Sequence, residues 1–134
     1  MAVVVLDSSA VIAYLRGEPG KERVAAALLD DNISCQMHAV NLCEVFYDTL
    51  RAQGTAIADN VLADLALVGV QTVTEMDDDF LKKAGRLKVK YKISLADCFA
   101  LALMQRGNAE MLTADHHEFD PIVAAGESGI VFIR

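Results

Sequence analysis

The sequence predicts an α/β domain in which a mostly parallel sheet, of about five strands, carries helices on both faces. Short apolar, β-branched runs recur along the 134 residues, and amphipathic stretches of helical length separate them. This alternation is typical of parallel sheets. A hydrophobic content of 54% is sufficient for a core, and no linker or repeat interrupts residues 1–134, so we expect a single domain.

The predicted strands are short runs, of which the first is almost entirely valine and leucine, as in a strand buried on both faces. They span Ala2 to Leu6, Ile33 to Met37, Val70 to Val73, Glu110 to Thr113 and Ile130 to Ile133. In such sheets ligands bind outside the carboxyl ends of the strands. We therefore expect a functional site at that edge.

Helical patterns fill the intervals between these strands. The first begins after a cap at Ser8 or Ser9 and runs through Leu15. The others run from Lys21 to Leu29, from Ala39 to about Gln53, from Thr55 to Leu67, from Asp77–Asp79 through a basic segment between Lys82 and Lys92, from Leu95 to Gln105, and around His116 to Ala125. Pro19 suits the first turn of the second helix. Gly54 suits a left-handed stop after the third.

The charge distribution is uneven. A net charge of −7 argues against a passive nucleic-acid binder, which normally carries an excess of lysine and arginine. However, six of the twelve basic residues lie between Lys82 and Lys92 with no acid among them. This segment either guides RNA or is simply a solvated helix face. Carboxylates that bind metal would also contribute to the acidic total.

The cysteines and the hydropathy indicate a cytoplasmic protein with no membrane partner. Cys35, Cys43 and Cys98 are odd in number and lie in apolar contexts, which predicts reduced thiols in the core. No apolar run approaches the ~18 residues of a membrane span, and the N-terminus lacks a basic region typical of a signal peptide.

Acidic residues follow two of the predicted strands and occupy two of the helices. Asp7 and Asp115 stand where strands should end, so both carboxylates should reach the same edge of the sheet, although either could instead cap the helix that follows. Asp97 is either part of a capping box with Ser94 or a carboxylate in an apolar helix that needs a cation.

A polar stripe on the third predicted helix contains Asn41, Glu44 and Asp48 at positions i, i+3 and i+7. A solvated face is the simple interpretation, and Asp48 fits it as an exposed pair with Arg51. We expect Glu44 to contribute to the site, with Asn41 as a supporting residue.

If these carboxylates converge, they require a counterion. Two of them near 4 Å repel by about 4 kcal/mol at an effective dielectric of 20. An all-oxygen ligand set selects Mg²⁺ or Mn²⁺, either of which can activate water and hold a phosphodiester. Zinc would require sulfur or imidazole ligands, which are only fragmentary here.

Several segments, in this order, resemble the PIN domain family and its VapC-type toxins. They are Val4–Ala13, Asn41–Val45, Ser94–Ala102 and Leu112–Asp115, followed by Phe119. The resemblance implies a metal site made by Asp7, Glu44, Asp97 and Asp115, supported by Ser9 and Thr113, with Phe119 packed nearby. Phe119 follows Asp115 by four residues where many relatives have three, so Asp120 is an alternative last ligand.

The resemblance further implies a metal-dependent endoribonuclease that cleaves RNA with activated water. VapC toxins are neutralised by a small antitoxin and usually form homodimers, so we expect both partners. One alternative is a PIN scaffold with weak catalysis that binds protein or RNA. A phosphoacceptor receiver domain is a further alternative, but it needs an acid at the end of the third strand, where Val73 and Thr74 stand.

Overall fold

The computed structural model describes residues 1–134 and contains one five-stranded sheet in which every pairing is parallel. The strands are β1 (Ala2–Leu6), β2 (Ile33–His38), β3 (Val70–Val73), β4 (Glu110–Thr113) and β5 (Ile130–Phe132). The predicted fold class is therefore confirmed. The strand limits differ from those predicted by one residue, at the ends of β2 and β5.

The strand order β3-β2-β1-β4-β5 places β1 at the centre of the sheet. The chain builds outward from β1 to β3 and then crosses to the other side of β1 for β4 and β5. This reversal leaves a crevice at the carboxyl ends of β1 and β4, where sheets of this kind bind ligands. Leu6 pairs with Leu112, so Asp7 and Thr113 follow as neighbours at that edge.

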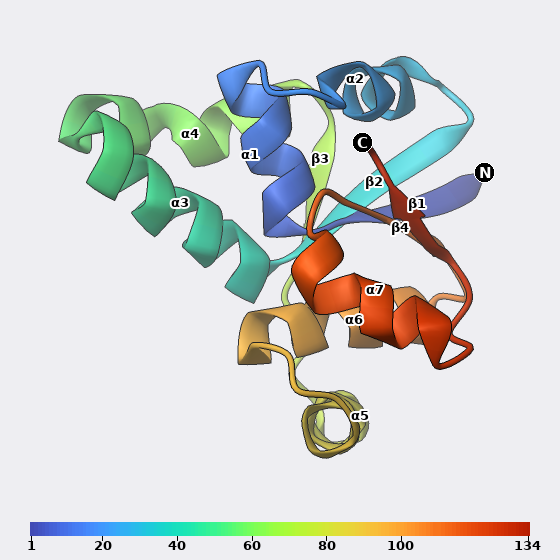
Figure 1. Ribbon diagram of the computed structural model, residues 1–134. Helices are drawn as coiled ribbons and strands as arrows, with labels where there is room; N and C mark the ends of the chain where they lie inside the picture. Colours follow the sequence, from blue (N-terminus) through green and yellow to red (C-terminus); the bar gives the residue numbers. More distant parts are fainter.

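Helices cover both faces of the sheet (Figure 1). They are α1 (Ser8–Arg16), α2 (Lys21–Leu29), α3 (Ala39–Gln53), α4 (Thr55–Leu67), α5 (Asp78–Lys90), α6 (Leu95–Arg106) and α7 (His116–Ala124). Side chains of α1 to α4 join one core cluster, and those of α5 to α7 join another. Within β1, Val4 and Leu6 belong to the first cluster and Val5 to the second, as strand alternation requires. None of the helices has the length and apolar character needed to cross a bilayer.

The helix ends decide between alternatives or differ from expectation. Of the possible caps of α1, Asp7 is the N-cap and Ser8 and Ser9 are not. Pro19 precedes the second helix, whose N-cap is Gly20 with a φ of 94°. Gly54 has a positive φ of 86°, but its ψ of 174° is extended and not left-handed helical, because the same residue ends α3 and begins α4.

The cysteines divide between core and surface. Cys35 and Cys98 are buried, as expected, and burial raises the pKa of both thiols. Cys43 is exposed, so its predicted place in the core is wrong. Its neighbours Leu42 and Val45 on α3 point into the core instead, which leaves the cysteine on the outer face of the helix.

Candidate metal site

Asp7 is held at the end of β1 by hydrogen bonds to both of its carboxylate oxygens. Oδ1 accepts from the backbone N–H of Ala10 at 2.9 Å and from the hydroxyl of Ser9 at 2.8 Å. Oδ2 accepts from the hydroxyl of Thr113 at 2.5 Å. The carboxylate therefore does cap α1, as one interpretation of the sequence expected, while it also faces β4.

Burial changes the ionisation of Asp7. The residue is 1% exposed, and burial, opposed by its hydrogen bonds, raises the pKa of its carboxyl to about 6. The negative charge of Asp115 contributes further to the increase in pKa. Thr113, which is fully buried, ties the two acids together, because its hydroxyl oxygen also accepts from the backbone N–H of Asp115 at 3.0 Å.

Asp97 lies in the first turn of α6 and is 8% exposed. Ser94 caps this helix and accepts a hydrogen bond from the backbone N–H of Asp97 at 3.1 Å, so the predicted cap is present. Burial raises the pKa of the Asp97 carboxyl to about 7, and the charges of Asp7, Glu44 and Asp115 raise it further. The side chain thus lies within the field of the other three predicted acids.

A tighter group forms where α6 meets the start of α7. Asp97, Asp115 and Glu118 each offer a carboxylate oxygen, and these oxygens lie within 4.8 Å of one another. Asp115 caps α7 through its Oδ1, which accepts from the backbone N–H of Glu118 at 3.0 Å. The capping geometry and the clustering of acids therefore coexist in the first turn of α7.

Glu44 reaches the site from α3, but it is not one of the three acids of the tight group. Its Oε1 accepts a hydrogen bond from the hydroxyl of Ser8, a residue that is itself buried. Asn41, one turn earlier, is fully buried, so the predicted solvated face does not extend to it. Its Nδ2 donates to the carbonyl of Ala96 at 3.0 Å, which fixes the peptide before Asp97.

Two of the acids considered from the sequence, Asp48 and Asp120, lie apart from this cluster. Asp48 forms an ion pair with Arg16 of α1 at 2.5 Å and a longer one with Arg51 at 3.8 Å, so the expected partner is present but is the more distant of the two. Asp120 lies on the exposed side of α7 and contacts the Nδ1 of His116 at 2.8 Å. The structure therefore places Asp115, and not Asp120, beside Asp97.

The donor set fits a divalent cation. Asp7, Glu44, Asp97, Asp115 and Glu118 form no ion pair with any lysine, arginine or histidine. Asp7 and Asp97 are buried, and buried carboxylates without a cationic partner are costly unless protonated or bound to a metal. Asn41 adds a buried Oδ1 that has no hydrogen-bond donor. Oxygen-only ligands of this kind suit Mg²⁺ or Mn²⁺.

The sequence comparison matches this arrangement to a family. The family model described as the PIN domain matches residues 4–122, which include every acid of the cluster. The chain belongs to the PIN domain family. Among curated proteins, no sequence matches this PIN domain significantly.

Solved structures share the fold over nearly the whole chain at low sequence identity. A toxin–antitoxin complex from Klebsiella pneumoniae has a TM-score of 0.73 at 18% identity, covering 98% of each chain. VapBC2 from Rickettsia felis, bound to a DNA fragment from its promoter, has a TM-score of 0.72 at 15% identity, covering 97% of this chain and 96% of that one. VapC20 from Mycobacterium tuberculosis, a sarcin-ricin loop cleaving toxin, has a TM-score of 0.70 at 18% identity, covering 92% and 95%.

Two residues of the candidate site, Glu118 and Ser8, could not be identified as functional candidates from the sequence. Glu118 was not predicted, although it lies three positions after Asp115 and therefore on the same side of the first turn of α7. Ser8 was visible only as a possible cap. No sequence signal connects Ser8 with Glu44, because the two residues are 36 positions apart.

Proposed function

We propose that this PIN domain is a metal-dependent endoribonuclease that hydrolyses phosphodiester bonds of RNA in the cytoplasm. The observation that carries the proposal is the gathering of carboxylates, without cationic partners, at the crevice between β1 and β4. We further propose that the protein is the toxin of a VapBC-type pair that binds a small antitoxin and forms a homodimer. Support comes from the shared fold of structures described as toxin–antitoxin complexes and as an RNA-cleaving toxin.

We assign Asp97 and Asp115 as the central metal ligands, with Asp7 and Glu44 completing the site. Glu118 is a further candidate ligand because of its place in the tight group. A bound Mg²⁺ or Mn²⁺ supplies an activated water and neutralises charge on the phosphodiester. The chain itself contributes fixed positions for these carboxylates.

Hydrogen bonds to the ligands explain how the positions are maintained. Thr113 and Ser9 hold the two oxygens of Asp7, while Ser8 holds Glu44. Asn41 anchors the beginning of α6 through Ala96. Metal ligands that are oriented by such partners keep their geometry when the ion dissociates, and loss of the partner weakens metal binding.

The decisive experiment is the Asp97→Asn substitution, which removes a charge and keeps the shape. Cleavage of single-stranded RNA in Mg²⁺ or Mn²⁺ should fall by about 100-fold or more, and a chelator should abolish the wild-type activity. The matched control is Asp120→Asn, since this acid also lies on α7 close in sequence to Asp115 but outside the cluster. It should cleave RNA at the wild-type rate.

The proposal is wrong if Asp97→Asn and wild type cleave equally, because the activity would then belong to a contaminant. Circular dichroism must show that the variant is folded. A wild-type protein that binds Mg²⁺ but cleaves no RNA would be a binding-only PIN scaffold.

A further inference from the structure

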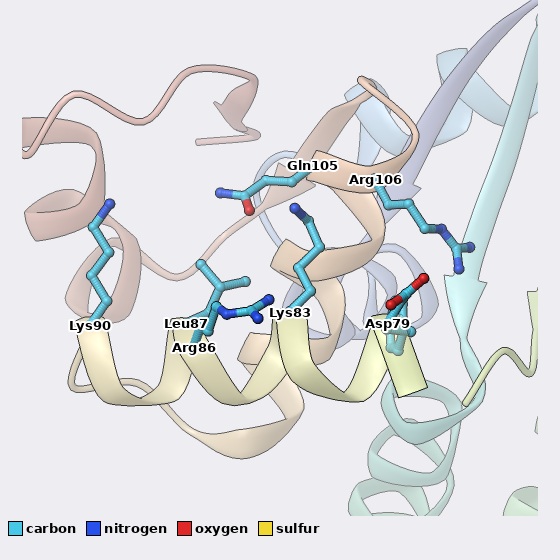
Figure 2. Close-up of a pocket in the computed structure, with 8 residues that line it drawn as sticks. Asp79, Lys83, Arg86, Leu87, Lys90, Gln105 and Arg106 are labelled. Atoms are coloured by element: carbon cyan, nitrogen blue, oxygen red, sulfur yellow. The ribbon is translucent and has the colours of Figure 1, made fainter. Parts of the chain in front are cut away.

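A second concave surface lies between α5 and α6, lined by positive charge (Figure 2). The groove has a volume of about 430 Å³. Its lining includes Lys83, Arg86 and Lys90 from α5 and Arg106 from the end of α6, with Asp79 as the only acid. Figure 2 shows Lys83 extending from α5 toward the end of α6, where Gln105 and Arg106 lie. Cations from two elements therefore meet in one hollow.

Two of these cations have no acidic partner. The Nζ of Lys90 lies 3.7 Å from the Oε1 of Glu127, and Arg106 forms an ion pair with Glu75. By contrast, no ion pair involves Lys83 or Arg86. Their charges are available to a ligand.

The positive surface continues along the outer side of α5. An adjoining hollow of about 470 Å³ shares Arg86 and Lys90 with the groove and adds Lys82. Gly85 lies between these residues, and open space surrounds the position where its side chain would be. We call the two hollows together the α5 groove.

The spacing and the surroundings of these charges favour a polyanion. Lys83, Arg86 and Lys90 fall at i, i+3 and i+7, so α5 presents a cation on each turn, about 5 Å apart. A polymer with a negative charge on every nucleotide matches such a row. Because the chain as a whole has a net charge of −7, this surface differs from most of the molecule.

The α5 groove and the candidate metal site share helix α6. Asp97 and Arg106 lie on the same helix, nine residues apart, which corresponds to about 13 Å along the axis of α6. A strand of RNA that occupies the metal site needs only a few further nucleotides to cover this distance.

We propose that the α5 groove binds the phosphate backbone of RNA at a distance from the bond that is cleaved. This inference rests on the proposed function, because it concerns the same substrate. The groove would hold the RNA without regard to sequence, since lysine and arginine contacts to phosphate carry no base information.

The test compares Lys83→Gln/Arg86→Gln with a control that loses the same charge elsewhere. Lys21→Gln/Arg23→Gln is suitable because both residues are exposed on α2, far from α5 (Figure 1). Binding of a long single-stranded RNA is measured by fluorescence anisotropy with a chelator present, which prevents cleavage.

The groove variant should bind about tenfold more weakly, and the magnitude of the slope of log K against log salt should fall by about 1.4, or 0.7 for each lost phosphate contact. The α2 control should retain the wild-type affinity and slope.

Cleavage kinetics supply an independent reading. With long RNA, the groove variant should show a higher KM and an unchanged kcat. With an RNA too short to reach from Asp97 to the groove, both constants should equal those of wild type. A purely structural role of Lys83 and Arg86 would change both substrates alike, which would overturn the proposal.

Three binding results would also overturn it. The first is that the groove variant keeps the wild-type RNA affinity and salt slope. The second is that the α2 control loses as much RNA affinity as the groove variant. The third is that the groove variant loses binding to polyglutamate but still binds RNA as wild type does, which would indicate an acidic protein partner. Failure of the proposed function looks different: RNA binds through the α5 groove in the wild type, but no cleavage occurs.

Discussion

Asp7 and Asp97 are ionisable groups that the fold buries away from water. Both carboxyls are buried, and the pKa of each is raised, to about 6 and about 7 respectively. Their hydrogen bonds favour the charged form but do not compensate for the loss of water. Without a cation, the folded protein is therefore destabilised wherever these groups are ionised.

The stability of the metal-free protein should accordingly depend on pH. The pKa of Asp7 and Asp97 in the folded state lies above the ordinary 3.8, so the folded protein holds more protons than the unfolded chain between about pH 4 and pH 7. The free energy of unfolding should fall as pH rises through this window, by up to about 1.4 kcal/mol per pH unit for each group. Urea denaturation with a chelator, at a series of pH values, measures this dependence.

Asp97→Asn provides the control for this prediction. An amide does not titrate, so the variant should lose part of the pH dependence and should be more stable than wild type at pH 8 without metal. Parallel curves for the two proteins would show that burial of Asp97 carries no such cost.

Helix N-termini assemble the site. Asp7 caps α1, Ser94 caps α6 and Asp115 caps α7, and these three helices begin at the same edge of the sheet. A cap requires a side-chain oxygen near the first N–H groups of the helix, which fixes the direction of the capping residue. Local capping therefore prepares Asp7 and Asp115 for a shared site.

The start of α2 depends on a glycine that packs against the end of the chain. Gly20 has a φ of 94°, and a Cβ there would lie 2.6 Å from the carbonyl oxygen of Ile133. Gly54 has a similar φ of 86°, but nothing lies within 4 Å of the same position. We expect Gly54→Ala to lower the free energy of unfolding by about 1–3 kcal/mol through backbone strain. Gly20→Ala should cost more, because a backbone carbonyl cannot yield as a flexible side chain can.

Urea denaturation of the two variants checks this order. Equal losses of stability would mean that the C-terminal segment moves away from α2 at little cost, and that its contact with Gly20 is weak.

Binding of a divalent ion should stabilise the molecule as a whole. The tight group of carboxylates comes from α6, from the β4–α7 connection and from the first turn of α7, so one ion would join segments that are distant along the chain. An ion that binds only the folded state at a hundred times its Kd contributes about 2.7 kcal/mol. Thermal unfolding should therefore shift upward with Mg²⁺ or Mn²⁺ and return with a chelator. Asp97→Asn should show a smaller shift, whereas an equal shift in both proteins would place the ion elsewhere.

Most of the architecture could be predicted from local pattern. Valine-rich runs and helical periodicity placed the strands and helices within about one residue of their observed ends, because such patterns depend on near neighbours. The same reasoning placed Asp7 and Asp115 at one edge, since parallel strands end together. It failed for Cys43, because which face of α3 is buried depends on what packs against the helix. It also failed for Pro19, because the residue at which α2 begins depends on how the preceding turn packs.

The assembly of the site required the fold. Asp97 and Asp115 are 18 positions apart, and nothing in their local sequence states that their oxygens lie within 4.8 Å together with Glu118. The contact of Ser8 with Glu44 and the position of Arg106 in one groove with the lysines of α5 are likewise products of helix packing. Secondary structure follows from interactions a few residues apart, but the burial and mutual repulsion that give these charges their chemistry arise only when distant elements meet in three dimensions.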